Sequence, residues 1–151
     1  MKESPTSGVH LWLVLAKAAR ALEAHSRNHI ETLGLGVSDF MVLEVLLHKG
    51  PLPVNAIGDK VLLTSGSMTA AVDRLAAKGL VERQDDPADR RSRIVRLTPA
   101  GRKLITAAFR DHAEAMERAA EGVSTRERAT LLRLLRKLGK GAEPHKDRAD
   151  V

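Results

Sequence analysis

The segment of residues 64–78 constrains the fold most strongly, because its apolar side chains recur at the spacing of one helical face. The positions i, i+3, i+4, i+7 and i+8 of a buried helical stripe are occupied by Met68, Ala71, Val72, Leu75 and Ala76. Thr64 or Ser65 is suited to the N-cap, and Gly79 is suited to a left-handed stop. The segment is therefore predicted to form a helix with one face in a hydrophobic core.

The opposite face of this predicted helix carries small and polar side chains. At about 100° per residue, that face consists of Gly66, Ser67, Ala70, Arg74 and Ala77, with Thr69 and Asp73 on one flank. Small residues let a helix enter a DNA groove, Ser and Thr can donate to phosphates or base edges, and Arg can pair with phosphate or guanine. Exposed helices also carry such residues simply because they face water, so this face alone does not establish DNA binding.

The elements on either side of this helix predict a winged arrangement. Apolar residues at 54, 57 and 61 predict a short preceding helix, and the connection at residues 62–63 is as short as that of a helix-turn-helix. After the helix, residues 80–83 and 93–97 are rich in β-formers and flank a polar loop, which predicts a two-stranded hairpin. In a winged helix of this order, the second helix reads the major groove and the hairpin can place arginines in a minor groove.

The predicted hairpin loop and returning strand, "DDPADRRSRIVRLTPAG", are rich in arginine. An isolated arginine run is usually a hydrated surface feature. Here the run follows a helix-turn-helix, which favours contact of Arg90, Arg91 and Arg93 with the DNA backbone or minor groove. Asp89 would repel phosphate unless an arginine neutralised it, so we interpret it as a brace that orients one of these arginines.

Two helices are predicted before the short turn. A helical period of apolar residues indicates a long amphipathic helix over residues 9–33, which Gly34 ends. Ser38 is suited to the N-cap of a second helix, which Gly50 and the following proline end. This second helix is apolar on several sides and is predicted to be buried.

Two more helices are predicted after the hairpin. Thr98 as N-cap and Pro99 at the first helical position start a long helix that continues to Gly122. Residues 124–127 form a capping box that opens a last helix, predicted to end near Gly139. The predicted fold class is mainly α with a small β-hairpin wing.

Composition limits the class of protein further. With 151 residues, 43% of them hydrophobic, the chain suits one domain with a hydrophobic core. Its formal net charge of +6 and pI near 10.1 suit a polyanionic partner. The absence of cysteine excludes disulfides, thiol nucleophiles and thiol-based sensing. The longest apolar run is far shorter than the roughly 18 residues of a membrane-spanning helix, so a cytoplasmic protein without a membrane partner is expected.

Other chemical functions have weaker support in the sequence. Asp39 or Glu44 could act with His48 as acid and base, yet no nucleophile, phosphate-binding loop or metal cluster accompanies them. Neither an enzyme nor a cofactor is therefore expected. His25 and His29 stand at i and i+4 on the first helix, a spacing that can ligate zinc. Because no acidic cluster accompanies them, partly buried structural histidines are expected rather than a metal site.

The sequence "LLTSGSMTAAVDRLAAKGLVERQDDPADRRSRIVRLTPAG" resembles the recognition helix and wing of the multiple antibiotic resistance regulator (MarR) family. The positions that match the family pattern are Asp73, Arg74, Leu75, Gly79, Leu80, Arg83, Asp86, Asp89, Arg91, Leu97, Thr98 and Gly101. The order of the flanking helices extends the likeness over nearly the whole chain. The resemblance implies a single domain over residues 1–151, with a winged helix-turn-helix DNA-binding region at 38–100 and dimerisation helices at 9–33 and 101–139.

The resemblance also implies partners. It implies a homodimer, built by the first and last helices, that binds pseudo-palindromic double-stranded DNA, commonly as a repressor released by a small aromatic or other anionic effector. Apolar residues at 11–15 and 131–138 exceed what one compact winged helix can cover, although packing within one subunit is the alternative. An organic effector would need a pocket among the first, second and fifth helices. Trp12, Arg20, Phe40, Met41 and His48 are residue types that could line one, but each suits the core or the surface equally well, so the effector-binding residues stay unassigned.

The candidate DNA-binding residues fall into two groups. Those of the recognition helix are Thr64, Ser65, Gly66, Ser67, Thr69, Ala70 and Arg74, and those of the wing are Arg90, Arg91 and Arg93, with Asp89 as their brace. Family members often carry a larger polar or basic residue in place of Ala70, so base readout would depend on its polar neighbours or on DNA shape. The leading hypothesis is a sequence-specific dimeric repressor. An architectural winged-helix DNA-binding protein without a ligand, and a winged helix that binds protein, remain alternatives.

Overall fold

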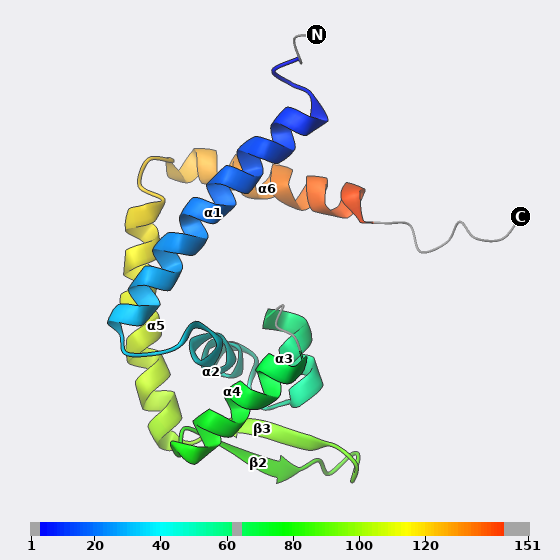
Figure 1. Cartoon of the computed structure of the whole chain (residues 1–151), viewed down its shortest axis with the longest axis vertical. Coiled ribbons are helices and arrows are strands. Elements are labelled where there is room, and N and C mark those ends of the chain that lie inside the picture. Colours follow the sequence, from blue (N-terminus) through cyan, green and yellow to red (C-terminus); the bar gives the residue numbers. More distant parts are fainter. Residues whose placement is uncertain (1–3, 62–64, 144–151) are drawn as a thin grey trace, which may run out of the picture. The chain divides into compact units, whose positions relative to one another are not determined.

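The computed structural model describes residues 4–61 and 65–143 (Figure 1). Its elements in chain order are α1 (Gly8–Thr32), α2 (Val37–Lys49), β1 (Leu52–Pro53), α3 (Val54–Val61), α4 (Ser65–Ala77), β2 (Val81–Asp85), β3 (Arg93–Leu97), α5 (Pro99–Ala119) and α6 (Thr125–Ala142). The chain divides into two compact units, residues 1–117 and 118–151. The prediction of a mainly helical fold with a small β wing is confirmed. Within the described ranges, no helix combines the length and the apolar character needed to cross a membrane.

The sheet of the first unit is antiparallel and three-stranded, with the order β1-β3-β2. β2 and β3 form the predicted hairpin, in which Val81 pairs with Leu97. β1 lies on the other edge of β3, where Leu52 pairs with Val95. The sequence pattern does not predict β1, because the strand is too short to show alternation and Pro53 has no backbone N–H to donate.

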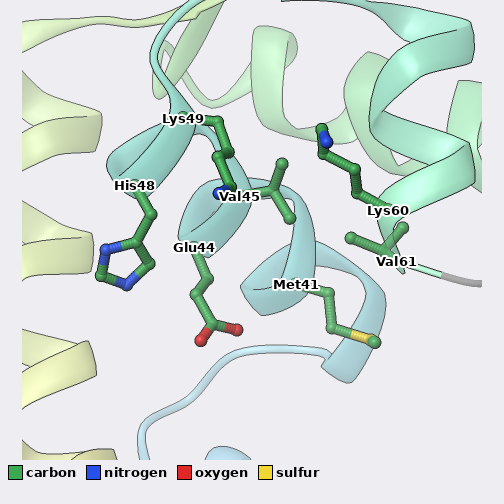
Figure 2. Close-up of a pocket in the computed structure, with 7 residues that line it drawn as sticks. All are labelled: Met41, Glu44, Val45, His48, Lys49, Lys60 and Val61. Carbon is green, nitrogen blue, oxygen red and sulfur yellow. The ribbon is translucent and has the colours of Figure 1, made fainter. Parts of the chain in front are cut away.

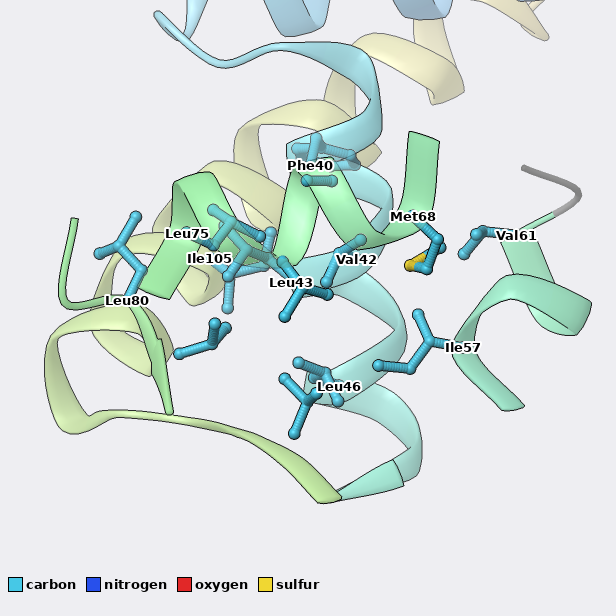
Figure 3. Close-up of a cluster of buried hydrophobic side chains, with 14 of the residues drawn as sticks. Phe40, Val42, Leu43, Leu46, Ile57, Val61, Met68, Leu75, Leu80 and Ile105 are labelled. Atoms are coloured by element: carbon cyan, nitrogen blue, oxygen red, sulfur yellow. The ribbon is translucent and has the colours of Figure 1, made fainter. Parts of the chain in front are cut away.

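The core of the first unit is built around α2, as Figure 3 shows. From α2 come Phe40, Val42, Leu43 and Leu46, and against them pack Ile57, Met68, Val72, Leu75, Val95 and Ile105 from α3, α4, β3 and α5. The predicted stripe of α4 is confirmed, since Met68, Ala71, Val72 and Leu75 are buried and Ala76 is partly buried. Burying one large apolar side chain contributes about 1.5–3 kcal/mol, so this contact determines which face of α4 points away from the core.

Two helix boundaries differ from the prediction. α2 begins at Val37 with Gly36 as N-cap, so the prediction that Ser38 is the N-cap is wrong. The helix starts earlier because Val37 packs against the hydrophobic core, a tertiary contact that cap preferences do not contain. α6 continues to Ala142, beyond the predicted end near Gly139.

The predicted turns after α4 and after the hairpin are confirmed. Gly79 has a φ of +70°, the left-handed conformation expected after a helix. The Thr98 hydroxyl accepts the Gly101 N–H at 3.0 Å and donates to the Gly79 carbonyl at 2.6 Å. In the second unit, Ser124 and Glu127 form the predicted capping box. Thr98 thus joins the end of α4 to the start of α5.

Gly101 lies against the backbone of Leu80, and this contact generates a test. A Cβ at position 101 would lie 1.9 Å from the Leu80 carbonyl oxygen and 2.8 Å from its carbonyl carbon. The same oxygen accepts the Thr98 N–H at 3.1 Å, so it cannot retreat without losing that bond. We expect Gly101→Ala to lower the free energy of unfolding by about 3 kcal/mol or more, measured by urea unfolding followed by circular dichroism.

Gly139→Ala is the matched control, because Gly139 is also helical and a Cβ there would meet no atom within 4 Å. Its stability should be equal to or above that of the wild type, since Ala is the better helix former. A Gly101→Ala protein as stable as the wild type would contradict the close contact with Leu80.

Candidate nucleic-acid interface

The face of α4 that points away from the core is exposed. Its exposed residues are Gly66, Ser67, Thr69, Ala70, Asp73, Arg74 and Ala77. Ser65 is the first residue of α4, and Thr64 lies outside the described residues. Arg74 is the one long side chain on this face between residues 66 and 77. The face is therefore narrow, which suits a helix that enters a DNA groove.

Arg74 is held by a carboxylate from α2. Its Nε and Nη2 both donate to Oδ1 of Asp39, at 3.2 Å and 2.8 Å. The Asp39 side chain is 6% exposed and that of Arg74 is 52% exposed. The hydrogen bond to Asp39, and then its negative charge, raise the pKa of Arg74 above its usual range. Lys78 also approaches Asp39, with its Nζ 3.9 Å from Oδ2.

The sequence places Arg74 on the exposed face but does not identify Asp39 as its partner. The available signal is that Asp39 stands in a helix predicted to be buried, where a charge requires a partner. That partner cannot be assigned from spacing, because Asp39 and Arg74 are 35 positions apart in the chain.

Two further arginines, on the wing strands, pair with carboxylates of the protein itself. Arg83 Nη2 donates to Oδ1 of Asp73 at 2.6 Å, which ties β2 to α4. Arg96 of β3 pairs with Glu82, the residue directly opposite on β2. These contacts hold the hairpin strands together and tie them to α4. The other arginines of the wing lie near the hairpin tip.

The tip of the wing is closed by backbone hydrogen bonds. Asp89 accepts the Arg91 N–H at 2.9 Å through its side chain, and its own carbonyl accepts the Ser92 N–H at 3.0 Å. Asp89 therefore holds the turn through the backbone, whereas the sequence interpretation has it orient a guanidinium group. Arg90 and Arg91 are exposed. Arg93 Nε lies 3.9 Å from Oδ1 of Asp85, and both side chains are well exposed. This ion pair therefore contributes at most about 1 kcal/mol to stability.

A cavity of about 490 Å³ lies beside α2, within the first unit. Its lining residues are Glu23, Ser26, Arg27, Ile30, Val37, Phe40, Met41, Glu44, Val61 and His112. Of the residues that could line an effector pocket, Phe40 and Met41 line this cavity, whereas Trp12 and Arg20 do not. Arg27 donates to Glu23 at 2.8 Å, so the cation at this cavity is already paired. The volume and the mostly apolar floor suit a small organic molecule.

A second cavity of about 420 Å³ lies on the neighbouring side of α2 (Figure 2). Met41, Glu44, Val45, His48 and Lys49 line it from α2, and Lys60 and Val61 line it from α3. Burial raises the pKa of Glu44 above its usual range, and the charge of nearby His48 acts in the opposite direction. His48, one of the residues that could line a pocket, lines this cavity, and its ring also packs edge-on against Phe109 of α5.

The histidines connect α1 to α5. His29 Nδ1 lies 3.2 Å from His112 Nδ1, and Ser26 Oγ lies 3.3 Å from the other ring nitrogen of His112. His25 Nε2 lies 3.0 Å from the Ala115 carbonyl oxygen. These contacts agree with structural histidines, and across residues 4–61 and 65–143 no group of three or more potential ligands is arranged to hold a metal ion.

The buried side chain of His112 should make the stability of the protein depend on pH. Burial, and then the charges of His29 and His25, lower the pKa of His112. Below the ordinary histidine pKa of about 6.5, the unfolded chain binds a proton that folded His112 does not. The free energy of unfolding should therefore fall as pH decreases below about 6.5, by at most about 1.4 kcal/mol per pH unit from this group.

Urea unfolding at about pH 7.5, 6.5 and 5.5 measures this dependence. His112→Gln should flatten it, whereas His10→Gln, at an exposed histidine of α1, should leave it as in the wild type. An unchanged slope in His112→Gln would show that protonation of His112 does not oppose folding.

The chain matches a known protein family and several known proteins. A family model described as MarR family matches residues 33–92. The chain is 38% identical over 133 residues to the HTH-type transcriptional regulator MhqR of Bacillus subtilis (strain 168), an alignment that covers 88% of this chain and 92% of the relative. It is also 33% identical over 138 residues to the HTH-type transcriptional regulator YkoM of the same organism, covering 91% of this chain and 90% of the relative.

The fold of the chain is also similar to that of solved structures. BpsR of Bordetella bronchiseptica, whose DNA binding is regulated by 6-hydroxynicotinic acid, has a TM-score of 0.74 at 26% identity, covering 85% of this chain and 98% of that chain. A mutant MarR from E. coli in complex with operator DNA has a TM-score of 0.76 at 21% identity, covering 91% and 99%. At that identity the second likeness concerns the fold alone.

Proposed function

Because the chain belongs to the MarR family of winged helix-turn-helix transcriptional regulators, which bind DNA and are not enzymes, we propose that it is a homodimeric repressor of transcription. In this proposal α4 of each protomer enters a major groove of a pseudo-palindromic operator, and a small-molecule effector releases the DNA. The observation that carries the proposal is the exposed narrow face of α4 beside a wing whose tip exposes Arg90 and Arg91.

The proposed DNA contacts come from both elements. In the recognition helix and its start they are Thr64, Ser65, Gly66, Ser67, Thr69, Ala70 and Arg74, and in the wing they are Arg90, Arg91 and Arg93. With twofold symmetry, the two copies of α4 would lie roughly 34 Å apart, one turn of B-DNA. The net charge of +6 favours association with the phosphate backbone.

Exposed apolar side chains support the homodimer. On α1 they are Val9, Leu11, Trp12, Leu13, Val14 and Leu22, and on α6 they are Leu131, Leu132, Leu134 and Leu138. Isolated exposed apolar residues are ordinary, but a continuous run of them on one helix favours an interface. A twofold dimer buries the same surface on both copies, and Trp12, at 65% exposure, is suited to anchor it.

The cavity of about 490 Å³ is the proposed effector site. Its apolar floor includes Phe40 and Met41, which suits a small aromatic ligand. An anionic group on that ligand would have to share Arg27 with Glu23. Phe40 follows Asp39 in α2, so a ligand that shifts α2 would also shift the carboxylate that holds Arg74. This connection gives the effector a physical route to α4.

The first test concerns the wing. Arg91→Ala should weaken DNA binding severalfold and reduce the slope of log affinity against log salt concentration by about 2, because each wing of the dimer loses one phosphate contact. Thermal unfolding should not change, since Arg91 is exposed. Fluorescence anisotropy with the duplex from the protein's own upstream region, repeated at several salt concentrations, measures both quantities.

Arg110→Ala is the matched control, because it removes the same charge from an exposed site on α5 outside the proposed interface. Its affinity and salt slope should match the wild type. Identical slopes for Arg91→Ala and the wild type would contradict the wing contact. If Arg91→Ala unfolded the protein, these arginines would instead be structural.

An architectural DNA-binding protein is the second candidate, favoured by the exposed methyl group of Ala70 at a position where family members often carry larger polar residues. Selection of bound duplexes from a random-sequence library separates the two candidates. A repressor enriches one pseudo-palindrome over random DNA, typically by a thousandfold or more at physiological salt. Enrichment that follows only A·T content would instead support the architectural protein.

A further inference from the structure

We propose that Asp39 is a positioning residue for DNA binding, which holds one edge of the Arg74 guanidinium so that the other edge is presented to the operator. The inference rests on the proposed function, because it concerns how α4 meets the DNA that it binds. It is carried by the geometry of the Asp39 and Arg74 side chains and by the contrast in their exposure.

The Asp39 carboxylate binds one edge of the Arg74 guanidinium. Nε and Nη2 of Arg74 share Oδ1 of Asp39 as their acceptor, at 3.2 Å and 2.8 Å. A guanidinium is planar and carries five N–H groups in a fixed fork, so the N–H groups of Nη1 and the second one of Nη2 point away from this carboxylate. That outer edge has the donor spacing that pairs with guanine or with two phosphate oxygens.

The position of the carboxylate is set by the core. Asp39 is 6% exposed and adjoins Phe40, which is fully buried, whereas Arg74 is 52% exposed on the outer face of α4. A free arginine samples many rotamers, and ordering it on binding lowers affinity. Because Asp39 fixes the guanidinium before DNA arrives, the cost of ordering Arg74 is already met in the folded protein.

Fold stability alone does not account for this pair. Burying the carboxylate of Asp39 costs desolvation energy, and the positions around Asp39 in α2 are mostly apolar. Its partner stands on the exposed face of α4 that is proposed to meet DNA. Lys78, 3.9 Å from the other oxygen of Asp39, adds a second cation at the same place. The three groups carry a net charge of +1 that faces outward.

A double-mutant cycle tests the proposal. The probe is the duplex selected from a random-sequence library with the full chain, and affinity is measured by fluorescence anisotropy at one salt concentration. Asp39→Asn should weaken binding about tenfold, although it removes a negative charge. In the Arg74→Met background the same substitution should change affinity less than twofold, because Asp39 acts through Arg74.

Asp111→Asn is the charge control, since it also removes one carboxylate charge but lies on α5 and pairs with Arg110. Its affinity should equal or slightly exceed that of the wild type. Circular dichroism confirms that each variant is folded. If Asp39→Asn loses helical signal, Arg74→Lys replaces it, because a lysine keeps the charge and a partner for Asp39 but lacks the fork. Arg74→Lys should also weaken binding about tenfold.

Two results would overturn the inference. One is an equal effect of Asp39→Asn with and without Arg74, and the other is an affinity of Arg74→Lys within twofold of the wild type. If the library selection enriches no sequence, the proposed function fails and this inference fails with it. Enrichment of a defined site together with either overturning result would contradict the role of Asp39 alone.

Discussion

The packing of α4 onto α2 is the contact on which the rest of the site depends. The apolar stripe of α4, with Met68 and Leu75 fully buried, leaves one orientation in which the helix can sit on the core. Turning α4 by one residue, about 100°, would move that stripe off the core and bring the charge of either Asp73 or Arg74 toward it, depending on the direction. The packing of the apolar face therefore determines which residues of α4 are exposed.

Two ion pairs complete this orientation from opposite flanks. Arg74 ties α4 to α2 through Asp39, and the preceding residue, Asp73, ties α4 to β2 through Arg83. Adjacent residues on α4 therefore fix it to two different elements. The position of the wing depends on the same helix, because strand β2 follows directly after the turn at Gly79.

Local patterns predict those features that depend on near neighbours. The buried stripe of α4, the left-handed Gly79 and the cap at Thr98 all follow from residues within a few positions of each other. The structure also gives a reason for the Thr98 and Gly101 motif, since a side chain at position 101 would collide with the Leu80 carbonyl. Features set by tertiary contact are not predictable in this way. The partner of Asp39, the short strand β1 and the start of α2 at Val37 all depend on segments that meet only in the folded chain.

α2 is the element that connects the parts of the proposed function. Phe40 and Met41 line the cavity proposed for the effector, and Asp39, one residue earlier, holds Arg74 on the face of α4 proposed to meet DNA. Buried packing resists continuous deformation, so a shift of α2 would move both contacts together. A ligand bound in this cavity would thereby affect α4 without touching it.

The decisive measurement is a crystal structure of the protein bound to its selected operator. We expect α4 in the major groove, with Arg74 still within hydrogen-bond distance of Asp39 and its outer edge on a base or phosphate. A complex in which the Arg74 guanidinium has left Asp39, or in which α4 remains outside the groove, would contradict it.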